Sequence, residues 1–121
     1  MSCEFVLVVE DDDDLREMIE DVLTLDGHQV VGVENGEQAL GALAVAMPNA
    51  VVTDLSMPMR TGYSLIERMR DQEPMRSIPV CVVSANTASE PEGTFAIRKP
   101  FEPGELLDTV RRLLRPRSAG S

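Results

Sequence analysis

Five consecutive acidic residues, Glu10 to Asp14, directly follow the apolar run Phe5–Val9. Carboxylates crowded in this way repel one another unless they share a cation. Hard divalent ions such as Mg²⁺ choose oxygen ligands of this kind, so a metal site is one hypothesis for the run. The alternative is that the acids open a helix, where they meet the positive end of the helix dipole. Other parts of the chain must decide between these two interpretations.

Short apolar runs alternate with helical patterns along the rest of the chain. Besides Phe5–Val9, the runs at residues 30–33, 50–53, 80–83 and 95–97 predict strands. Apolar residues at helical spacing predict four amphipathic helices, carried by Leu15, Met18 and Ile19, by Leu40, Leu43 and Met47, by Leu65, Ile66 and Met69, and by Leu106, Val110 and Leu113. Strands that are apolar on both faces and separated by helices indicate a parallel sheet covered on both sides. We therefore expect a doubly wound α/β fold with five parallel strands.

In such a sheet the ligand crevice lies outside the carboxyl ends of the strands. Polar residues stand at four of the predicted ends: Glu10 and Asp11 after the first strand, Asp54 after the third, Ser84 after the fourth and Lys99 after the fifth. Three acids, one hydroxyl and one ammonium would then line a single rim. That set can bind a divalent cation and a phosphoryl group together.

The size and charge of the chain narrow the possible partners. Its 121 residues suit one compact domain, and 21 acidic against 11 basic residues give a net charge of -10. This sign argues against nucleic-acid binding and against anionic membrane surfaces. The sequence shows neither a secretory signal nor an apolar run long enough to span a membrane, and its two cysteines make no disulfide framework. We expect one cytoplasmic domain over residues 1–121, with its core at about 4–115 and a loose tail at 116–121.

Four short motifs stand in order on the expected elements: Val8-Val9-Glu10-Asp11, Asp54-Leu55-Ser56-Met57-Pro58 followed by Gly62, Val82-Val83-Ser84-Ala85, and Lys99-Pro100-Phe101. From Phe5 to about Leu114 the chain resembles the receiver domain of two-component response regulators. Each motif is weak alone, but the ordered set is specific. The resemblance implies the flavodoxin-like receiver fold and a cis bond at Lys99-Pro100. It also suggests a stand-alone regulator of the chemotaxis type, since no effector domain follows the last helix.

The resemblance implies that Asp54 accepts a phosphoryl group from a sensor histidine kinase or a histidine phosphotransfer protein. A carboxylate is a competent nucleophile toward phosphorus. Mg²⁺, or Mn²⁺, would be held by Asp11, Asp54, the carbonyl of Ser56 and, largely through water, Glu10. Lys99 would pair with one phosphoryl oxygen and Ser84 would donate a hydrogen bond to another. The domain would catalyse only its own phosphorylation and dephosphorylation, act on no outside substrate, and signal by contact with a downstream protein.

The same residues test several rival interpretations. We expect Asp12, Asp13 and Asp14 to start the first helix, with Glu17 three residues past Asp14 as in a capping box. An EF-hand loop counted from Asp11 would need glycine where Arg16 stands. A dehalogenase-type phosphatase would usually place a second acid at Ser56, and a dinucleotide fold would want glycines after the first strand. The remaining rival is a receiver-like interaction module that signals without phosphorylation.

Two features depart from the family pattern. The interval from Ser84 to Lys99 is about seven residues shorter than usual, roughly two helical turns, and residues 85–93 have a loop-like composition. We therefore expect the fourth helix to be missing or reduced to a turn. The family also places an aromatic residue three positions before the lysine, where this chain has Ala96, while the adjacent Phe95 should face the opposite way. Phosphate acceptance could then persist while the output path avoids the usual face of fourth helix, fifth strand and fifth helix.

Overall fold

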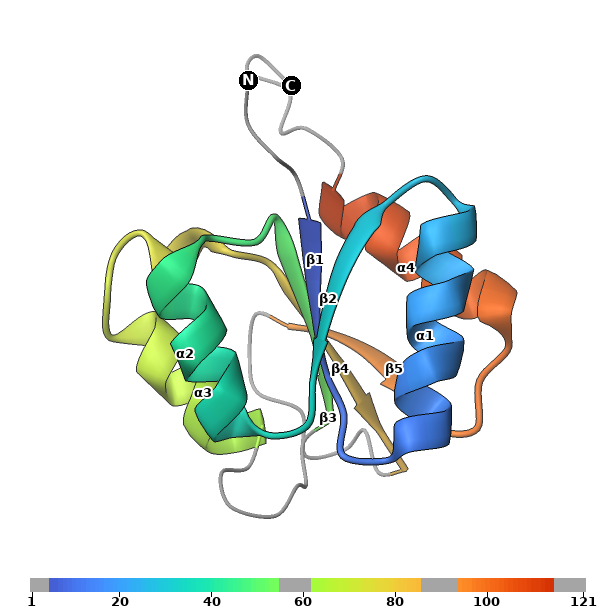
Figure 1. The fold of residues 1–121 in the computed structure, drawn as a ribbon, viewed down its shortest axis with the longest axis horizontal. Helices are drawn as coiled ribbons and strands as arrows, with labels where there is room; N and C mark the ends of the chain where they lie inside the picture. Colours follow the sequence, from blue (N-terminus) through green and yellow to red (C-terminus); the bar gives the residue numbers. More distant parts are fainter. Residues whose placement is uncertain (1–4, 55–61, 86–93, 115–121) are drawn as a thin grey trace.

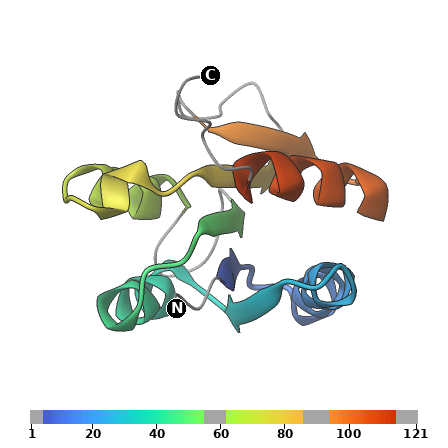
Figure 2. The ribbon, with the colours of Figure 1, turned by 90° about the horizontal axis from the view of Figure 1, so that it is seen from above.

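The computed structural model describes residues 5–54, 62–85 and 94–114 as one α/β unit. Its elements are β1 (Phe5–Val9), α1 (Asp13–Leu25), β2 (Gln29–Val33), α2 (Gly36–Val45), β3 (Ala50–Asp54), α3 (Gly62–Arg70), a 3₁₀ turn η1 (Met75–Ser77), β4 (Val80–Ser84), β5 (Phe95–Arg98) and α4 (Pro103–Leu114). The strands form one parallel sheet in the order β2-β1-β3-β4-β5. Helices α1 and α4 cover one face of the sheet, and α2 and α3 cover the other (Figures 1 and 2). The doubly wound, five-stranded fold is confirmed.

The predicted elements all occur, with small shifts at their ends. Strands β3 and β4 run one residue further than predicted, so Asp54 and Ser84 are the last residues of their strands. Pro103 opens α4, a position where its missing N–H costs no hydrogen bond. The described residues contain four α-helices, which is consistent with a shortened helix between β4 and β5. Residues 86–93, on which that expectation falls, lie outside the described residues.

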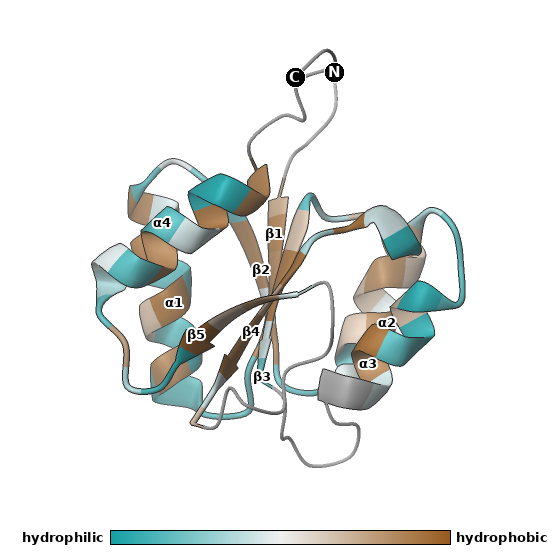
Figure 3. Ribbon diagram, turned by 180° about the vertical axis from the view of Figure 1, so that it is seen from behind, coloured by the Kyte–Doolittle hydropathy of each residue, from teal (hydrophilic) through white to brown (hydrophobic). Residues whose placement is uncertain are grey.

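Two apolar layers hold the sheet in place. Alternate side chains of a strand point to opposite faces, so Val6 and Val8 pack toward α1 and α4, while Leu7 and Val9 pack toward α2 and α3. Helices α1, α3 and α4 turn apolar residues inward and polar residues outward (Figure 3), whereas α2 also leaves Gly41, Ala44 and Val45 exposed. Burying one such Val or Leu side chain contributes about 1.5–3 kcal/mol. The carboxyl edge of the sheet is therefore a rigid platform. Within the described ranges, no helix combines the length and apolar character needed to cross a bilayer.

The acid run begins helix α1 at Asp12. This residue has an extended backbone, and its carboxylate accepts a hydrogen bond from the backbone N–H of Leu15 at 3.1 Å. Asp13 and Asp14 occupy the first helical turn, where their charges suit the helix dipole. The predicted helix-start role of these three acids agrees with the structure. The capping box with Glu17 is wrong, because the helix starts earlier than assumed and Glu17 lies beyond the position that could reach back.

The cap predicts a specific pattern of stability. Asp12→Ala removes the acceptor for the Leu15 amide and should lower the free energy of unfolding by about 1 kcal/mol. Asp12→Asn retains an acceptor oxygen, so its loss should be clearly smaller. Urea unfolding followed by circular dichroism measures both variants against the native protein. Equal losses in the two variants would show that charge, and not the hydrogen bond, stabilises this end of α1.

Candidate functional site

The register of the sheet brings the predicted site residues to one rim. Val9 of β1 pairs with Thr53 of β3, so the next residues lie side by side: Glu10 directly after β1, and Asp54 at the end of β3. Ser84 ends β4 one position beyond the partner of Asp54, and it pairs in turn with Arg98, the residue before Lys99. The backbone N–H of Lys99 also donates to the carbonyl of Ser84 at 2.9 Å. The rim therefore combines residues from four separate segments of the chain.

Lys99 is the cation at the centre of the acidic rim. Its Nζ donates to Oδ2 of Asp54 at 2.7 Å and lies 3.5 Å from Oε1 of Glu10. Burial lowers the pKa of Lys99, but the hydrogen bond to Asp54 and the charge of Glu10 outweigh this, so the pKa lies above its ordinary value. The ammonium is therefore charged at neutral pH. The Lys99-Pro100 bond is cis, as the resemblance implied.

Glu10 is the most deeply placed of the acids, with only 2% of its surface exposed. Its backbone N–H donates to the carbonyl of Val33 at 3.0 Å, and its Oε2 accepts from the backbone N–H of Asp12 at 3.2 Å. Burial raises the pKa of the Glu10 carboxyl to about 7; the Asp12 amide and Lys99 oppose this rise, and the charge of Asp54 adds to it. A buried carboxyl group whose pKa is raised to about 7 is only partly ionised at neutral pH. It needs further positive charge beside it to ionise fully.

The donor set fits a small divalent cation. One carboxylate oxygen from each of Glu10, Asp11 and Asp54 lies within 4.8 Å of the others. Opposite ligands of an octahedral Mg²⁺ are about 4 Å apart, and this ion takes one or two carboxylates together with waters. Asp11 is exposed and Asp54 is 8% exposed, so the cluster opens to solvent on one side. Ser56, the fourth predicted ligand, lies outside the described residues.

The strand at the edge of the site confirms the predicted departure from the family. Ala96 packs against the apolar layer of α2 and α3, whereas Ile97 belongs to the layer of α1 and α4. Phe95 pairs with Cys81, a residue of that second layer, and therefore faces away from Ala96; it is 42% exposed. The face on which the family carries its aromatic residue has only a methyl group here.

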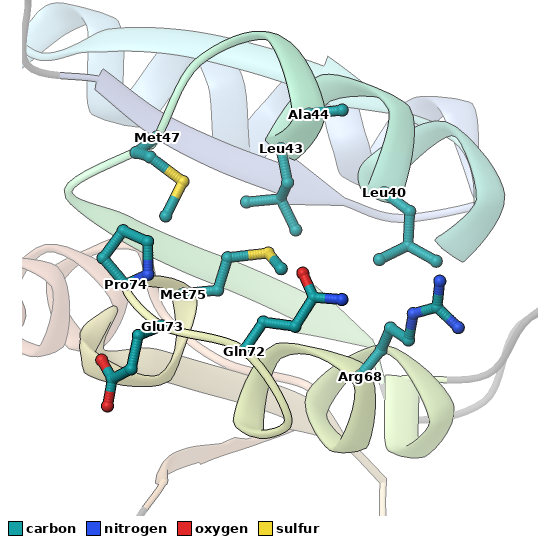
Figure 4. Close-up of a pocket in the computed structure, with 9 residues that line it drawn as sticks. All are labelled: Leu40, Leu43, Ala44, Met47, Arg68, Gln72, Glu73, Pro74 and Met75. Carbon is teal, nitrogen blue, oxygen red and sulfur yellow. The ribbon is translucent and has the colours of Figure 1, made fainter.

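Two hollows differ in their relation to the rim. A groove of about 690 Å³ borders Lys99 and runs between the start of α1 and the segment after β5; its lining is Asp12, Asp14, Leu15, Met18, Ala85, Lys99, Pro100 and Phe101. A second, of about 290 Å³, lies between α2 and the α3–η1 segment, where Leu43 and Met75 approach each other (Figure 4). The second holds none of the predicted site residues. Of these two hollows, the first borders Lys99 and thus lies beside the partner of Asp54.

Arg16 belongs to the site although the sequence did not indicate it. Its Nη1 donates to the backbone carbonyl of Glu10 at 2.9 Å, and its Nη2 contacts Oδ1 of Asp13 at 2.7 Å. The spacing of three residues from Asp13 signals an ion pair on the helix surface. It does not signal the contact with Glu10, because a backbone carbonyl leaves no trace in the residue pattern.

Known proteins share both the sequence and the fold of this chain. The family model described as "Response regulator receiver domain" matches residues 6–111. The transcriptional regulatory protein PrrA of Mycobacterium tuberculosis is 35% identical over 94% of this chain, which spans about half (51%) of that protein's length. A putative response regulator from Chloroflexus aurantiacus has a TM-score of 0.88 at 30% identity, covering 95% of this chain and all of that one (100%).

A third match concerns the metal. The receiver domain of the Pseudomonas aeruginosa sensor histidine kinase PA1611, with a magnesium ion coordinated in its active site cleft, has a TM-score of 0.85 at 26% identity. It covers 95% of this chain and 100% of its own. The matched range, residues 6–111, includes Glu10, Asp11, Asp54, Ser84 and Lys99. The chain belongs to the response regulator receiver domain family.

Proposed function

We propose that this domain is a phosphoacceptor switch in which Asp54 receives a phosphoryl group from a histidine of a sensor kinase or phosphotransfer protein. One observation carries the proposal: Lys99 Nζ holds Asp54 Oδ2 at 2.7 Å inside a cluster of three carboxylates. A structural ion pair would need one acid. Here Lys99 contacts two acids, Asp54 and Glu10, and Asp11 lies beside them. More acids than cations suit a site that binds a further cation and then phosphate.

The chain's own residues account for most of the transfer chemistry. An oxygen of Asp54 forms a bond to phosphorus while the phosphorus–nitrogen bond of the donor breaks, and the electron pair returns to the imidazole. Such transfers depend mainly on positioning and electrostatics. Lys99, already within hydrogen-bond distance of Asp54, would move its contact to a phosphoryl oxygen, and Ser84 on the adjacent strand would donate to another. Mg²⁺ or Mn²⁺ held by Glu10, Asp11 and Asp54, with the carbonyl of Ser56, would offset the negative charge shared by acids and phosphate.

A protein donor suits the groove beside Lys99. The groove is lined by the apolar residues Leu15, Met18 and Phe101 and by the acids Asp12 and Asp14. A helix with apolar and basic side chains would match both features. We propose that the exchange takes place in the cytoplasm, that the domain turns over no outside substrate, and that its output is contact with a downstream protein. The small residue at Ala96 supports an output that does not rely on an aromatic switch there.

Phosphorylation of Asp54 is the central test. Native protein incubated with Mg²⁺ and acetyl phosphate should gain the mass of one phosphoryl group, and beryllofluoride should shift NMR signals around Asp54 and Lys99. Asp54→Asn should show neither effect, because the amide is not a nucleophile, while Asp21→Asn on the outer side of α1 should behave as native. No adduct on the native chain, or an equal signal from Asp54→Asn, would contradict the switch and favour the phosphorylation-independent interaction module.

The division of the acid run predicts which residues bind metal. Asp11→Asn should weaken Mg²⁺ affinity at least about tenfold, since even residues that only support metal ligands typically cost that much. Asp14→Asn removes the same charge from the same run but from the first turn of α1, and should change the affinity far less. Calorimetric titration with Mg²⁺ gives both values. Equal weakening by the two variants would mean that the run attracts cations as a diffuse field and not at a defined site.

The raised pKa of Glu10 predicts how the metal-free domain responds to pH. Between pH 4.5 and about 7 the unfolded chain has lost the Glu10 proton while the folded chain retains it. The folded state then binds more protons, so its stability falls as pH rises through this window. In EDTA, Glu10→Gln should not show this fall in stability. The free energy of unfolding of the variant, relative to that of native protein, should therefore rise from pH 4.5 to about pH 7. A difference that does not change with pH in urea unfolding would show that Glu10 ionises normally.

A further inference from the structure

Arg16 connects helix α1 to the turn that carries both metal-binding acids. Its guanidinium reaches back from the first turns of the helix to the carbonyl of Glu10, at 2.9 Å, and its second nitrogen holds Asp13. The Arg16 side chain is only 15% exposed, whereas Asp13 is 73% exposed. A surface ion pair alone would not bury the arginine so well, so the buried contact with Glu10 is the more informative of the two.

The direction of the Glu10 carbonyl affects the position of Asp11. The peptide unit between the two residues is planar, so the direction of that carbonyl also sets where the Cα of Asp11 lies. The other contacts of the turn fix its flanks: the Glu10 N–H bonds to Val33, and the Asp12 N–H bonds to the Glu10 carboxylate. Arg16 therefore holds the peptide unit that joins Glu10 to Asp11. The carboxylates of both residues lie close to that of Asp54.

The neighbouring strand makes room for this arrangement. Gly32 pairs with Val8 and faces α1; a Cβ at Gly32 would overlap the Glu20 carboxylate and come within 3.3 Å of Cδ of Arg16. The stem of the arginine thus passes over a glycine on β2 on its way to Glu10. The hydrogen bond to Asp13 and the charges of Asp13, Glu34 and Glu20 raise the pKa of the Arg16 guanidinium above its ordinary value.

We propose that Arg16 is a positioning residue that orients the Glu10-Asp11 peptide, and with it the two carboxylates that would receive the metal ion. The inference rests on the proposed function, since it concerns the same rim. Arginine suits the task better than lysine, because its planar fork can bind the Glu10 carbonyl and Asp13 together, whereas an ammonium is a single point of charge. Residues that orient metal ligands in this way typically affect metal affinity 10–100-fold.

The test compares native protein with Arg16→Gln, Arg16→Lys and Arg111→Gln. Arg111 is the matched control, because it also makes a two-pronged contact, with Asp26 at 3.0 and 2.5 Å, but at a place without site residues. Titration with Mg²⁺ alone should show about tenfold weaker affinity in both Arg16 variants. Arg111→Gln should bind Mg²⁺ as native protein does, whatever stability it loses.

A metal-free readout tests the same idea independently. In EDTA, hydrogen exchange of the Asp12 amide, which bonds to the Glu10 carboxylate, should be about tenfold faster in both Arg16 variants and unchanged in Arg111→Gln. Native affinity and native Asp12 exchange in folded Arg16→Gln would overturn the proposal. Full recovery of both by Arg16→Lys would also overturn it, since charge alone would then suffice. If native protein binds no Mg²⁺, the proposed function fails while the Asp12 amide still decides the role of Arg16.

Discussion

Mutual repulsion among three carboxylates is the constraint around which this domain is organised. Glu10, Asp11 and Asp54 bring oxygens within 4.8 Å of one another, and Lys99 supplies a single positive charge to them. Unit charges about 4 Å apart repel by about 4 kcal/mol at the effective dielectric of a protein surface, and the pKa of Glu10, raised to about 7 by burial and further by the charge of Asp54, relieves part of this repulsion. Apolar layers on both faces stabilise the sheet. The sheet therefore holds its strand ends in register against the repulsion between the acids.

The same constraint explains how the acid run is divided. Glu10 and Asp11 lie where β1 leaves the sheet and point to the rim, whereas Asp12 turns to the Leu15 amide and begins α1. Asp12, Asp13 and Asp14 thus belong to the start of α1, whereas Glu10 and Asp11 belong to the rim. The guanidinium of Arg16 donates to the carbonyl of Glu10, and α1, with the positive end of its dipole, begins directly after these acids. Positive groups therefore lie close to the acids both at Lys99 and at the Glu10 carbonyl.

The sequence was sufficient for the fold and for most of the rim, because both depend on simple periodicities. Apolar runs of strand length placed Asp54 and Ser84 at strand ends, and parallel strands bring such ends together. The exact start of α1 was missed by two residues, because Asp12, Asp13 and Asp14 are equally good caps and only the backbone chooses among them. Arg16 was missed because it binds a carbonyl, and the raised pKa of Glu10 follows from burial that no local pattern encodes.

The absence of an aromatic side chain at Ala96 constrains how a change at Asp54 can travel. A methyl group cannot report phosphate by rotating inward, and Phe95 lies on the opposite face of β5. Phosphorylation would replace the single charge of the Asp54 carboxylate with about two negative charges on the phosphoryl group, a net gain of about one, so its first effect would be on Lys99, which contacts Asp54. That lysine is tied to β4 through the Ser84 carbonyl and stands four residues before α4 begins. We therefore expect the signal to pass along the ends of β4 and β5 into the start of α4, by electrostatics and backbone displacement.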